Sequence, residues 1–348
     1  MRIVVASVLT PFVRGGAEVL ADELVKALVA AGHQTELFQI PFNPASQSIP
    51  DQMLACALMN VGGVPGNEVD RLIALKFPAY LIPHHHKVVW LLHHFRAAYD
   101  LWDHSFGSLR TAPYGALVRD IVQRADSKVA IESKAFFTLS ANVSRRVSKY
   151  WKVNSTPLHH PPASAELFYC ANQLDDFLFF PSRLAANKRQ DLALQALALT
   201  RNPVRLKFAG TPDSPPYFDR LDQLARELGV GKRIEWMGFL SEAQKRDAYA
   251  RSLAVLFPPF DEDYGYVTLE AMLASKAVIT CDDSGGPLEF VLPNETGLVT
   301  AATPESLAAA LDTIWADRDL ARTLGQAGRK HYDQLGLSWN NVVRQLTA

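Results

Sequence analysis

The chain has 348 residues, of which 48% are hydrophobic and 20% charged, and its formal net charge is −1. This length suits two domains of about 150 to 180 residues each. The near-neutral charge excludes a global basic field for nucleic acid, and the apolar runs are far shorter than the ~20 residues that a membrane span needs. Three cysteines, Cys56, Cys170 and Cys281, form no C-x-x-C spacing, which favours a reducing compartment and argues against structural zinc. We therefore expect a cytoplasmic protein.

The first half begins with the pattern of a βαβ unit. Residues 3–8 are an apolar run, Gly15 and Gly16 follow, and residues 17–31 and 35–40 have the patterns of a helix and a strand. Such a unit favours a parallel sheet. Residues 43–66, richer in Pro, Asn, Gly and Ser, are predicted to be irregular. Further predicted strands are 79–82, 88–92, 128–131 and 136–139, and further predicted helices are 117–125, a helix near Ser133, and 142–150.

A second βα series follows a proline-containing link at residues 156–172. Its predicted strands are 177–181, 204–209, 234–237, 253–257, 278–281 and 297–299, and its predicted helices include 191–199, 218–228 and 267–274. We therefore predict an α/β chain with two Rossmann-like domains, residues 1–160 and 161–330.

The most informative stretch surrounds Glu262 and Glu270, two carboxylates with seven residues between them. Glu262 follows an apolar run that has the pattern of a buried strand, and Glu270 lies in the next predicted helix. Between them is the turn Tyr264-Gly265-Tyr266, and the amides of Gly265, Tyr266 and Val267 begin the helix. These amides and the helix dipole form a natural site for a phosphate or pyrophosphate. The carboxylates could then bind hydroxyls of sugars attached to that pyrophosphate.

Together with Ser284-Gly285-Gly286-Pro287-Leu288-Glu289, this stretch resembles the signature of the retaining family 4 (group 1) glycosyltransferases. The glutamate pair, the Leu-Glu-Ala-Met segment and the glycine pair match. The family's order Gly-Gly-x-Pro-Glu is Gly-Gly-Pro-Leu-Glu here, so no role is assigned to Glu289. The resemblance implies a GT-B fold, in which two Rossmann-like domains face one another across a cleft. It also implies that the C-terminal segment, residues 331–348 with a helix at 339–346, returns to the first domain.

Two more groups of residues follow predicted strands. Arg183 and Lys188 come after the first strand of the second domain, where ligands of open α/β sheets bind. By resemblance they match the family's diphosphate-binding pair. Gly15 and Gly16 lie between the first strand and the first helix, where glycine lets amides approach an anion. On the residues alone this is a tight turn, whereas the resemblance implies a place for Gly15 and Gly16 at the cleft.

Histidines end the predicted strand 88–92. The family has a histidine at this strand end, close to the transferred sugar, and His93 is the better match because it comes first after the apolar run. His94 is the alternative. Three adjacent histidines, His84 to His86, cannot all face one metal ion from an extended segment, so we interpret them as a solvent loop. The Asp261-Glu262-Asp263 string has the D-x-D pattern that binds metal in another glycosyltransferase fold. Since Arg183 and Lys188 supply positive charge, we expect no metal and no other cofactor.

The resemblance implies transfer of a sugar from a UDP- or GDP-linked donor to a hydroxyl of a glycan or lipid-linked glycan, with retention, in surface polysaccharide biosynthesis. Glu270 would hold the ribose and Glu262 the donor sugar. The catalytic candidates are His93, Arg183, Lys188 and Glu262. A lipid-linked acceptor implies peripheral contact with the inner membrane. A non-catalytic nucleotide-sugar-binding subunit and a GT-B phosphorylase or epimerase remain alternatives, whereas the glycine spacing disfavours a nicotinamide dehydrogenase.

Overall fold

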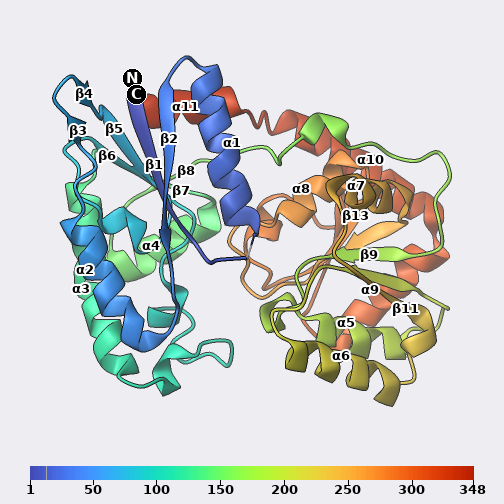
Figure 1. Ribbon diagram of the computed structural model, residues 1–348. Coiled ribbons are helices and arrows are strands. Elements are labelled where there is room, and N and C mark those ends of the chain that lie inside the picture. The colour runs from blue at the N-terminus through green and yellow to red at the C-terminus, as the bar shows by residue number, and fades with distance from the viewer. Residues whose placement is uncertain (13) are drawn as a thin grey trace. The chain divides into compact units, whose positions relative to one another are not determined.

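The computed structural model describes residues 1–12 and 14–348, and the chain divides into two compact units (Figure 1). The first unit contains residues 1–163 together with residues 338–348, and the second contains residues 164–337. Each unit is built around a parallel sheet covered by helices on both faces, as expected where βαβ crossovers place helices against a sheet.

Six parallel strands form the main sheet of the first unit within the described residues, in the order β2-β1-β5-β6-β7-β8. These strands are β1 (Arg2–Leu9), β2 (Gln34–Pro41), β5 (Arg71–Ala74), β6 (Lys87–Leu91), β7 (Ala135–Thr138) and β8 (Thr156–Pro157). A small antiparallel pair, β3 (Gly63–Val64) and β4 (Asn67–Glu68), lies outside this sheet.

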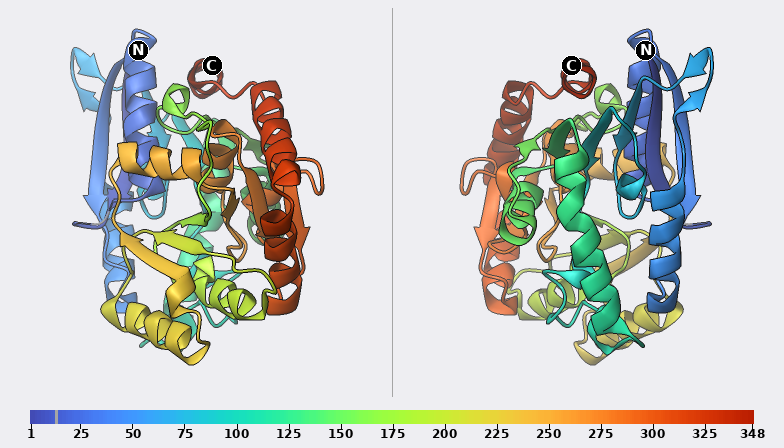
Figure 2. Two further views of the ribbon diagram at one scale, coloured as in Figure 1. Left: turned by 90° about the vertical axis from the view of Figure 1, so that its right-hand side faces the viewer. Right: turned by 90° about the vertical axis from the view of Figure 1, so that its left-hand side faces the viewer.

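The helices of the first unit divide between the two faces of its sheet. They are α1 (Gly16–Ala30), α2 (Ile49–Leu58), α3 (Gly115–Glu132), α4 (Ala141–Trp151) and α11 (Trp339–Thr347). Apolar side chains of α2, α3 and α4 share one core with strands β5 and β6, and Figure 2 shows α3 lying across the strands. Helices α1 and α11 lie side by side (Figure 1), and Arg71 of β5 donates to the carbonyl oxygen of Leu346 at 2.8 Å.

Several secondary-structure predictions for the first half are wrong. Residues 79–82 form a 3₁₀ turn (Ala79–Leu81) and not a strand, because Pro78 and Pro83 flank it and proline cannot donate to a ladder. The strand that the sequence analysis missed is β5. Residues 128–131 continue α3, whose buried face includes Val118, Val122 and Val129. Ser133 ends that helix and does not begin another.

One helix lies in the region predicted to be irregular, residues 43–66. Helix α2 begins at Ile49 and carries a proline in its first turn, where the missing amide hydrogen costs no helical bond. Its side chains Ile49, Met53 and Cys56 are buried. Tertiary burial of this short apolar face therefore outweighs a composition that favours loops.

The second unit follows the predicted βα series closely. Its six parallel strands, within the described residues, have the order β11-β10-β9-β12-β13-β14. They are β9 (Leu178–Pro181), β10 (Leu206–Ala209), β11 (Ile234–Gly238), β12 (Ala254–Leu256), β13 (Ala277–Cys281) and β14 (Gly297–Thr300). Numbered within the unit this is 3-2-1-4-5-6, the order of a Rossmann fold, and its direction reverses between β9 and β12.

Helices cover both faces of the second sheet. They are α5 (Gln190–Leu199), α6 (Pro215–Glu227), α7 (Glu242–Arg251), α8 (Tyr266–Leu273), α9 (Pro304–Ala316) and α10 (Arg318–Gln334). Figure 1 shows α7 and α8 on one face and α5, α6 and α9 on the other. The helices α5, α6 and α9 share a core of buried apolar side chains with strands β9, β10, β12 and β13. The predicted fold class, two Rossmann-like α/β units, is confirmed.

No helix among residues 1–12 and 14–348 combines the length and the apolar character that crossing a bilayer requires.

Candidate active site

The strand order of the second unit brings Lys188 and Glu262 together. Lys188 follows β9 and Glu262 follows β12, the two neighbouring strands at which the order reverses. The crevice beyond the carboxyl ends of such strands is where open α/β sheets bind ligands. The Lys188 Nζ atom lies 2.5 Å from Glu262 Oε2, and the two side chains are only 13% and 21% exposed. The structure therefore joins, in one partly buried ion pair, two residues that are 74 positions apart in the sequence.

Backbone hydrogen bonds hold the loops of this edge in register. The Phe260 amide donates to the Asn187 carbonyl oxygen at 2.7 Å, which ties the loop after β12 to the loop after β9. The Glu262 amide donates to the Ser284 carbonyl oxygen at 2.9 Å, and the Gly286 amide donates to the Glu262 carbonyl oxygen at 2.8 Å. Glu262 is thus fixed on both sides by the loop after β13.

A second ion pair at this edge joins Arg189 to Asp283, and the sequence analysis missed it. Both terminal nitrogens of Arg189 donate to the Asp283 carboxylate, at 2.7 and 2.5 Å, a bidentate geometry that fixes the orientation of both groups. The Arg189 guanidinium also lies 5.1 Å from the centroid of the Phe260 ring. The sequence could have indicated these two residues as candidates, because each is next to a recognised one. Arg189 directly follows Lys188, and Asp283 directly precedes the Ser284-Gly285-Gly286 motif.

Arg183 lies at the same edge but in a more open setting. Its guanidinium pairs with Asp213 at 2.8 Å, and the two side chains are 53% and 43% exposed. The loop carrying Asp213 is attached to the Arg183 loop, since the Asp213 amide donates to the Leu184 carbonyl oxygen at 2.9 Å. An exposed pair of this kind is weak and salt-sensitive, so an incoming anion can readily take the place of Asp213.

Glu270 is the fifth residue of α8 and is held by two side chains of α7. Its Oε1 atom lies 3.0 Å from Lys245 Nζ, and the Tyr249 hydroxyl donates to its Oε2 atom at 2.7 Å. Tyr249 is fully buried, and burial and the Glu270 charge raise its pKa well above the ordinary value. No spacing in the sequence indicated Lys245 or Tyr249, because they lie on another helix.

The start of α8 requires a glycine. Gly265 has φ of +88°, the left-handed region that side chains disfavour, and a Cβ atom there would lie 2.8 Å from Pro287 Cγ. Tyr266 and Val267 follow as the first residues of the helix. Tyr264 is 2% exposed, and its ring packs edge-on against Tyr266 and Phe290. Its side chain therefore supports the turn from inside, which leaves the backbone amides as the groups of this turn suited to a phosphate.

The first unit places Gly15, Gly16 and His93 after strands of its own sheet. Gly15 caps α1, and its amide donates to Glu18 Oε2 at 2.8 Å. His93 follows β6 and is half-buried, and its Nδ1 atom lies 2.8 Å from the His94 carbonyl oxygen. Because a carbonyl can only accept, Nδ1 is the protonated nitrogen, which makes Nε2 the acceptor in the neutral ring.

His94 is fully buried and belongs to a polar cluster with Asp100 and Arg96. Its Nε2 atom lies 2.7 Å from Asp100 Oδ1, and Arg96 pairs with the other carboxylate oxygen at 2.8 Å. Burial pushes the pKa of Asp100 upward, but the hydrogen bond from His94 and the charge of Arg96 outweigh it and lower the pKa to about 2. An ionised carboxylate therefore anchors the segment that follows His93.

The histidine run His84 to His86 faces the backbone. His84 Nε2 lies 3.1 Å from the Val69 carbonyl oxygen, and His86 Nδ1 lies 3.2 Å from the Asp70 carbonyl oxygen. Over residues 1–12 and 14–348, the structure contains no group of three His, Cys, Asp or Glu side chains arranged to hold a metal ion.

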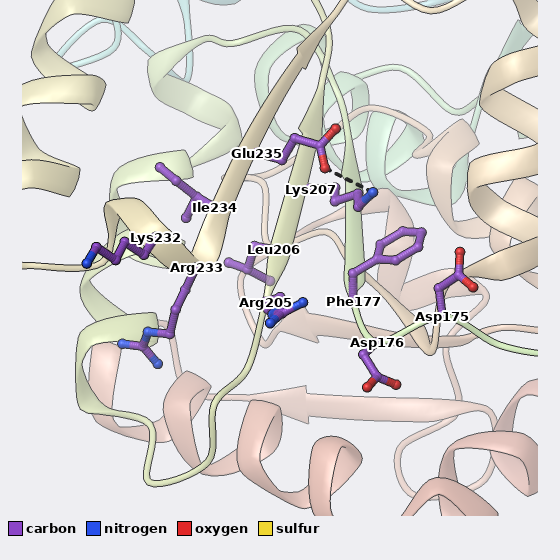
Figure 3. A pocket seen from close by; sticks show the side chains of 10 residues that line it. All are labelled: Asp175, Asp176, Phe177, Arg205, Leu206, Lys207, Lys232, Arg233, Ile234 and Glu235. Atoms are coloured by element: carbon purple, nitrogen blue, oxygen red, sulfur yellow. Dashed lines mark ion pairs between the residues drawn. The ribbon is translucent and has the colours of Figure 1, made fainter.

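A surface hollow of about 420 Å³ lies at the other edge of the second sheet (Figure 3). Its lining residues begin the strands β9, β10 and β11, and its charged groups include Arg205, Lys232 and an ion pair between Lys207 and Glu235. It lies at the amino ends of the strands, opposite to the edge where parallel sheets bind ligands. We therefore place the candidate site at Lys188 and Glu262 and not in this hollow.

Comparisons with known proteins give a family match that lies within the second unit. Residues 171–331 match the family model described as glycosyl transferases group 1. Over 167 residues the chain is 29% identical to the alpha-1,3/1,6-mannosyltransferase ALG2 of Mus musculus, a match that covers 44% of this chain and 40% of that protein. The chain spans less than half the length of the curated relatives that it matches.

Two solved structures cover nearly the whole chain. Sucrose-phosphate synthase from Thermosynechococcus elongatus superposes with a TM-score of 0.82 at 18% identity, over 99% of this chain and 97% of its own. Anabaena HepE, in complex with UDP and glucose, superposes with a TM-score of 0.74 at 16% identity, over 100% of this chain and 98% of its own. These likenesses show that the fold is GT-B. Residues 171–331, within the second unit, are similar to the glycosyl transferases group 1 family.

Proposed function

We propose that the chain transfers a sugar from a UDP- or GDP-linked donor to a hydroxyl of a glycan or lipid-linked glycan, with retention of the anomeric configuration. The observation that carries this proposal is the pairing of Lys188 with Glu262 at the point where the strand order of the second sheet reverses. That point is the ligand position of open α/β sheets, and a cation beside a carboxylate suits a ligand that combines phosphates with sugar hydroxyls.

In this proposal the donor diphosphate takes over the cations of the edge. Lys188 exchanges Glu262 for a phosphate oxygen, and Arg183 leaves its exposed partner Asp213 for another. The amides of Gly265, Tyr266 and Val267 add donors at the start of α8, where the helix dipole also favours negative charge. These groups stabilise the charge that builds on the leaving diphosphate, so they contribute more in the transition state than in the ground state.

The carboxylates then bind the sugars on either side of the diphosphate. Glu262, released from Lys188, accepts hydrogen bonds from hydroxyls of the transferred sugar, and Glu270 accepts them from the ribose. His93 of the first unit accepts a hydrogen bond from a hydroxyl of the donor sugar through Nε2, and Gly15 and Gly16 offer backbone amides to the donor. We propose substitution on one face of the sugar, in which the leaving phosphate takes the proton of the acceptor hydroxyl.

The names of the relatives and neighbours support a nucleotide-sugar donor. Anabaena HepE was solved with UDP and glucose, and mouse ALG2 is named a mannosyltransferase. From these names we extend to this chain only the class of substrate. A role in surface polysaccharide biosynthesis, a cytoplasmic location and peripheral contact with the membrane that carries a lipid-linked acceptor belong to the same proposal.

The experiment screens the protein by thermal shift against UDP- and GDP-sugars, and then measures hydrolysis and transfer of the donor that stabilises it. Glu262→Gln should lower turnover about 10²- to 10³-fold while the melting temperature changes little, as for the loss of one preorganised contact. The matched control is Glu235→Gln, which breaks the surface ion pair with Lys207 at the opposite edge of the same sheet. Unchanged turnover in Glu262→Gln would discard the proposal, and stabilisation without any turnover would identify a nucleotide-sugar-binding subunit instead.

A further inference from the structure

Glu270 receives one hydrogen bond on each carboxylate oxygen, and both come from α7. Lys245 Nζ lies 3.0 Å from Oε1, and the Tyr249 hydroxyl lies 2.7 Å from Oε2. The Glu270 side chain is 12% exposed, so it is not completely shielded from solvent. The carboxylate is thus held by two hydrogen-bond donors, both on helix α7.

Tyr249 has little freedom to move. Its side chain is 0% exposed, and its ring packs edge-on against Phe179 at 5.1 Å and Phe168 at 5.8 Å between centroids. These contacts lock the position of the hydroxyl, and the hydroxyl in turn fixes the carboxylate plane.

Lys245 supplies the charge in this arrangement. It pairs with Glu270 and with the exposed Glu242, both at 3.0 Å. Burial alone would lower the pKa of Lys245, but the two carboxylates outweigh burial and raise it. Lys245 therefore stays protonated and donates to the Glu270 carboxylate.

The number of acceptor positions left on Glu270 is the key quantity. An ionised carboxylate has about four acceptor positions, two on each oxygen. Lys245 and Tyr249 occupy one on each oxygen, so one remains on each. Two remaining acceptor positions, one per oxygen, match in number the 2′- and 3′-hydroxyls of a ribose, which lie next to each other on the same side of the ring.

We infer that Lys245 and Tyr249 are positioning residues. They orient the Glu270 carboxylate so that it accepts hydrogen bonds from both hydroxyls, and the site therefore binds ribonucleotides more tightly than 2′-deoxyribonucleotides. This inference rests on the proposed function, since it names the sugar that the donor nucleotide must carry. A site built to bind a hydroxyl rejects the analogue that lacks it, because its own acceptor is then left without a partner.

The test is calorimetric titration of UDP, 2′-deoxy-UDP, GDP and 2′-deoxy-GDP into the whole chain. For the base that binds, the wild type should prefer the ribonucleotide by about 10- to 100-fold, the value of a hydrogen bond to a charged group. Tyr249→Phe keeps the ring contacts and removes only the hydroxyl. It should weaken binding of the ribonucleotide about tenfold, leave the deoxyribonucleotide nearly unchanged, and so reduce the preference about tenfold.

Lys245→Met should reduce the same preference, and Lys245→Arg, which keeps the charge, should restore most of it. There are two matched controls. Tyr169→Phe removes a tyrosine hydroxyl that donates to Asp247, another residue of α7. Lys207→Met breaks a different Lys–Glu ion pair of the second unit, the one with Glu235. Both controls should keep the wild-type preference. A merely structural role would lower the melting temperature without changing the ratio of the two affinities.

The inference is overturned if Tyr249→Phe and Lys245→Met keep the wild-type preference, or if the wild type binds both sugars equally well. If the wild type binds none of the four nucleotides, the proposed function itself fails. These outcomes are distinguishable, because the first two leave nucleotide binding intact.

Discussion

The two sheets have similar architecture but carry very different chemistry at their carboxyl edges. In the second unit the edge carries ion pairs, Lys188 with Glu262 and Arg189 with Asp283, and Glu270 of α8 is paired with a lysine of its own. In the first unit the candidate residues are two glycines and His93, none of which carries a fixed charge. Charged, hydrogen-bonded groups in fixed positions suit an anionic ligand of constant structure.

This difference shows how one fold can support two kinds of recognition. The strands fix the positions of the loops, and the residue types on the loops determine what binds. We interpret the second unit as the donor side, where every substrate of the proposed reaction presents the same nucleotide diphosphate. The first unit then meets a neutral, variable acceptor, for which hydrogen-bonding groups are sufficient.

Among the variants that test this comparison, we expect Lys188→Met to lower kcat/KM the most. Lys188→Met removes a partly buried cation, and we expect a loss of kcat/KM of about 10²-fold. Arg183→Met removes a cation that is half exposed, and the loss should be about fivefold, within the range of a solvent-screened pair. Steady-state kinetics at two salt concentrations would check both values, with Lys207→Met as control. If Lys188→Met and Arg183→Met lowered kcat/KM equally, burial of the cation would not determine its contribution to activity.

A smaller effect is expected at His93 of the first unit. His93→Ala removes one hydrogen bond to a neutral hydroxyl, so kcat/KM should fall about 3- to 10-fold. His85→Ala, in an exposed loop of the same unit, is the control and should leave kinetics unchanged. If His93→Ala lost as much activity as Lys188→Met, the first unit would take part in the chemistry far more than its uncharged candidate residues indicate.

The first unit also contains a buried carboxyl group, on helix α3. Asp126 of α3 is fully buried and accepts hydrogen bonds from the Tyr80 hydroxyl at 2.7 Å and the Tyr99 hydroxyl at 2.9 Å. Burial raises the pKa of Asp126 from 3.8 to about 7, even though both hydroxyls act to lower it. The folded state therefore binds a proton more tightly than the unfolded state.

This pKa predicts the smallest effect, a change in stability and not in activity. Between about pH 4 and 7 the native state holds more protons, so the contribution of Asp126 to stability falls as the pH rises. The difference in free energy of unfolding between the wild type and Asp126→Asn should thus decrease by up to about 1.4 kcal/mol per pH unit. Urea unfolding at pH 5, 6, 7 and 8 measures it, with the exposed Asp120→Asn as control. Parallel pH curves for wild type and Asp126→Asn would refute the assignment.

The sequence predicted the second half better than the first, for physical reasons. Strands β9, β12 and β13 are apolar runs bounded by turns, so their pattern is visible locally. In the first half, strand β5 was missed, the 3₁₀ turn Ala79–Leu81 has an apolar composition like that of a strand, and helix α3 extends through residues that resemble a strand. Such ambiguous runs are decided by tertiary burial, which a local pattern does not contain.

For the candidate site, too, some residues could be predicted from the sequence and others could not. Glu262, Glu270, Arg183 and Lys188 follow strands or lie in helices whose order along the chain predicts a shared edge. Their partners were missed where the pairing crosses between elements, as for Tyr249 of α7 and Asp213 after β10. Side-chain pairing between elements depends on register and rotamer, and neither can be derived from spacing in one sequence.

The central claim is that the second unit binds a nucleotide diphosphate at the edge defined by Lys188, Glu262 and Glu270. Its most direct test is calorimetric titration of UDP and GDP into the wild type and into Glu270→Gln, with Glu305→Gln, an exposed glutamate of α9, as control. We predict that one of the two nucleotides binds the wild type and the control alike and binds Glu270→Gln about tenfold more weakly. Equal affinity for Glu270→Gln and the wild type, or no binding of either nucleotide to the wild type, would contradict the claim.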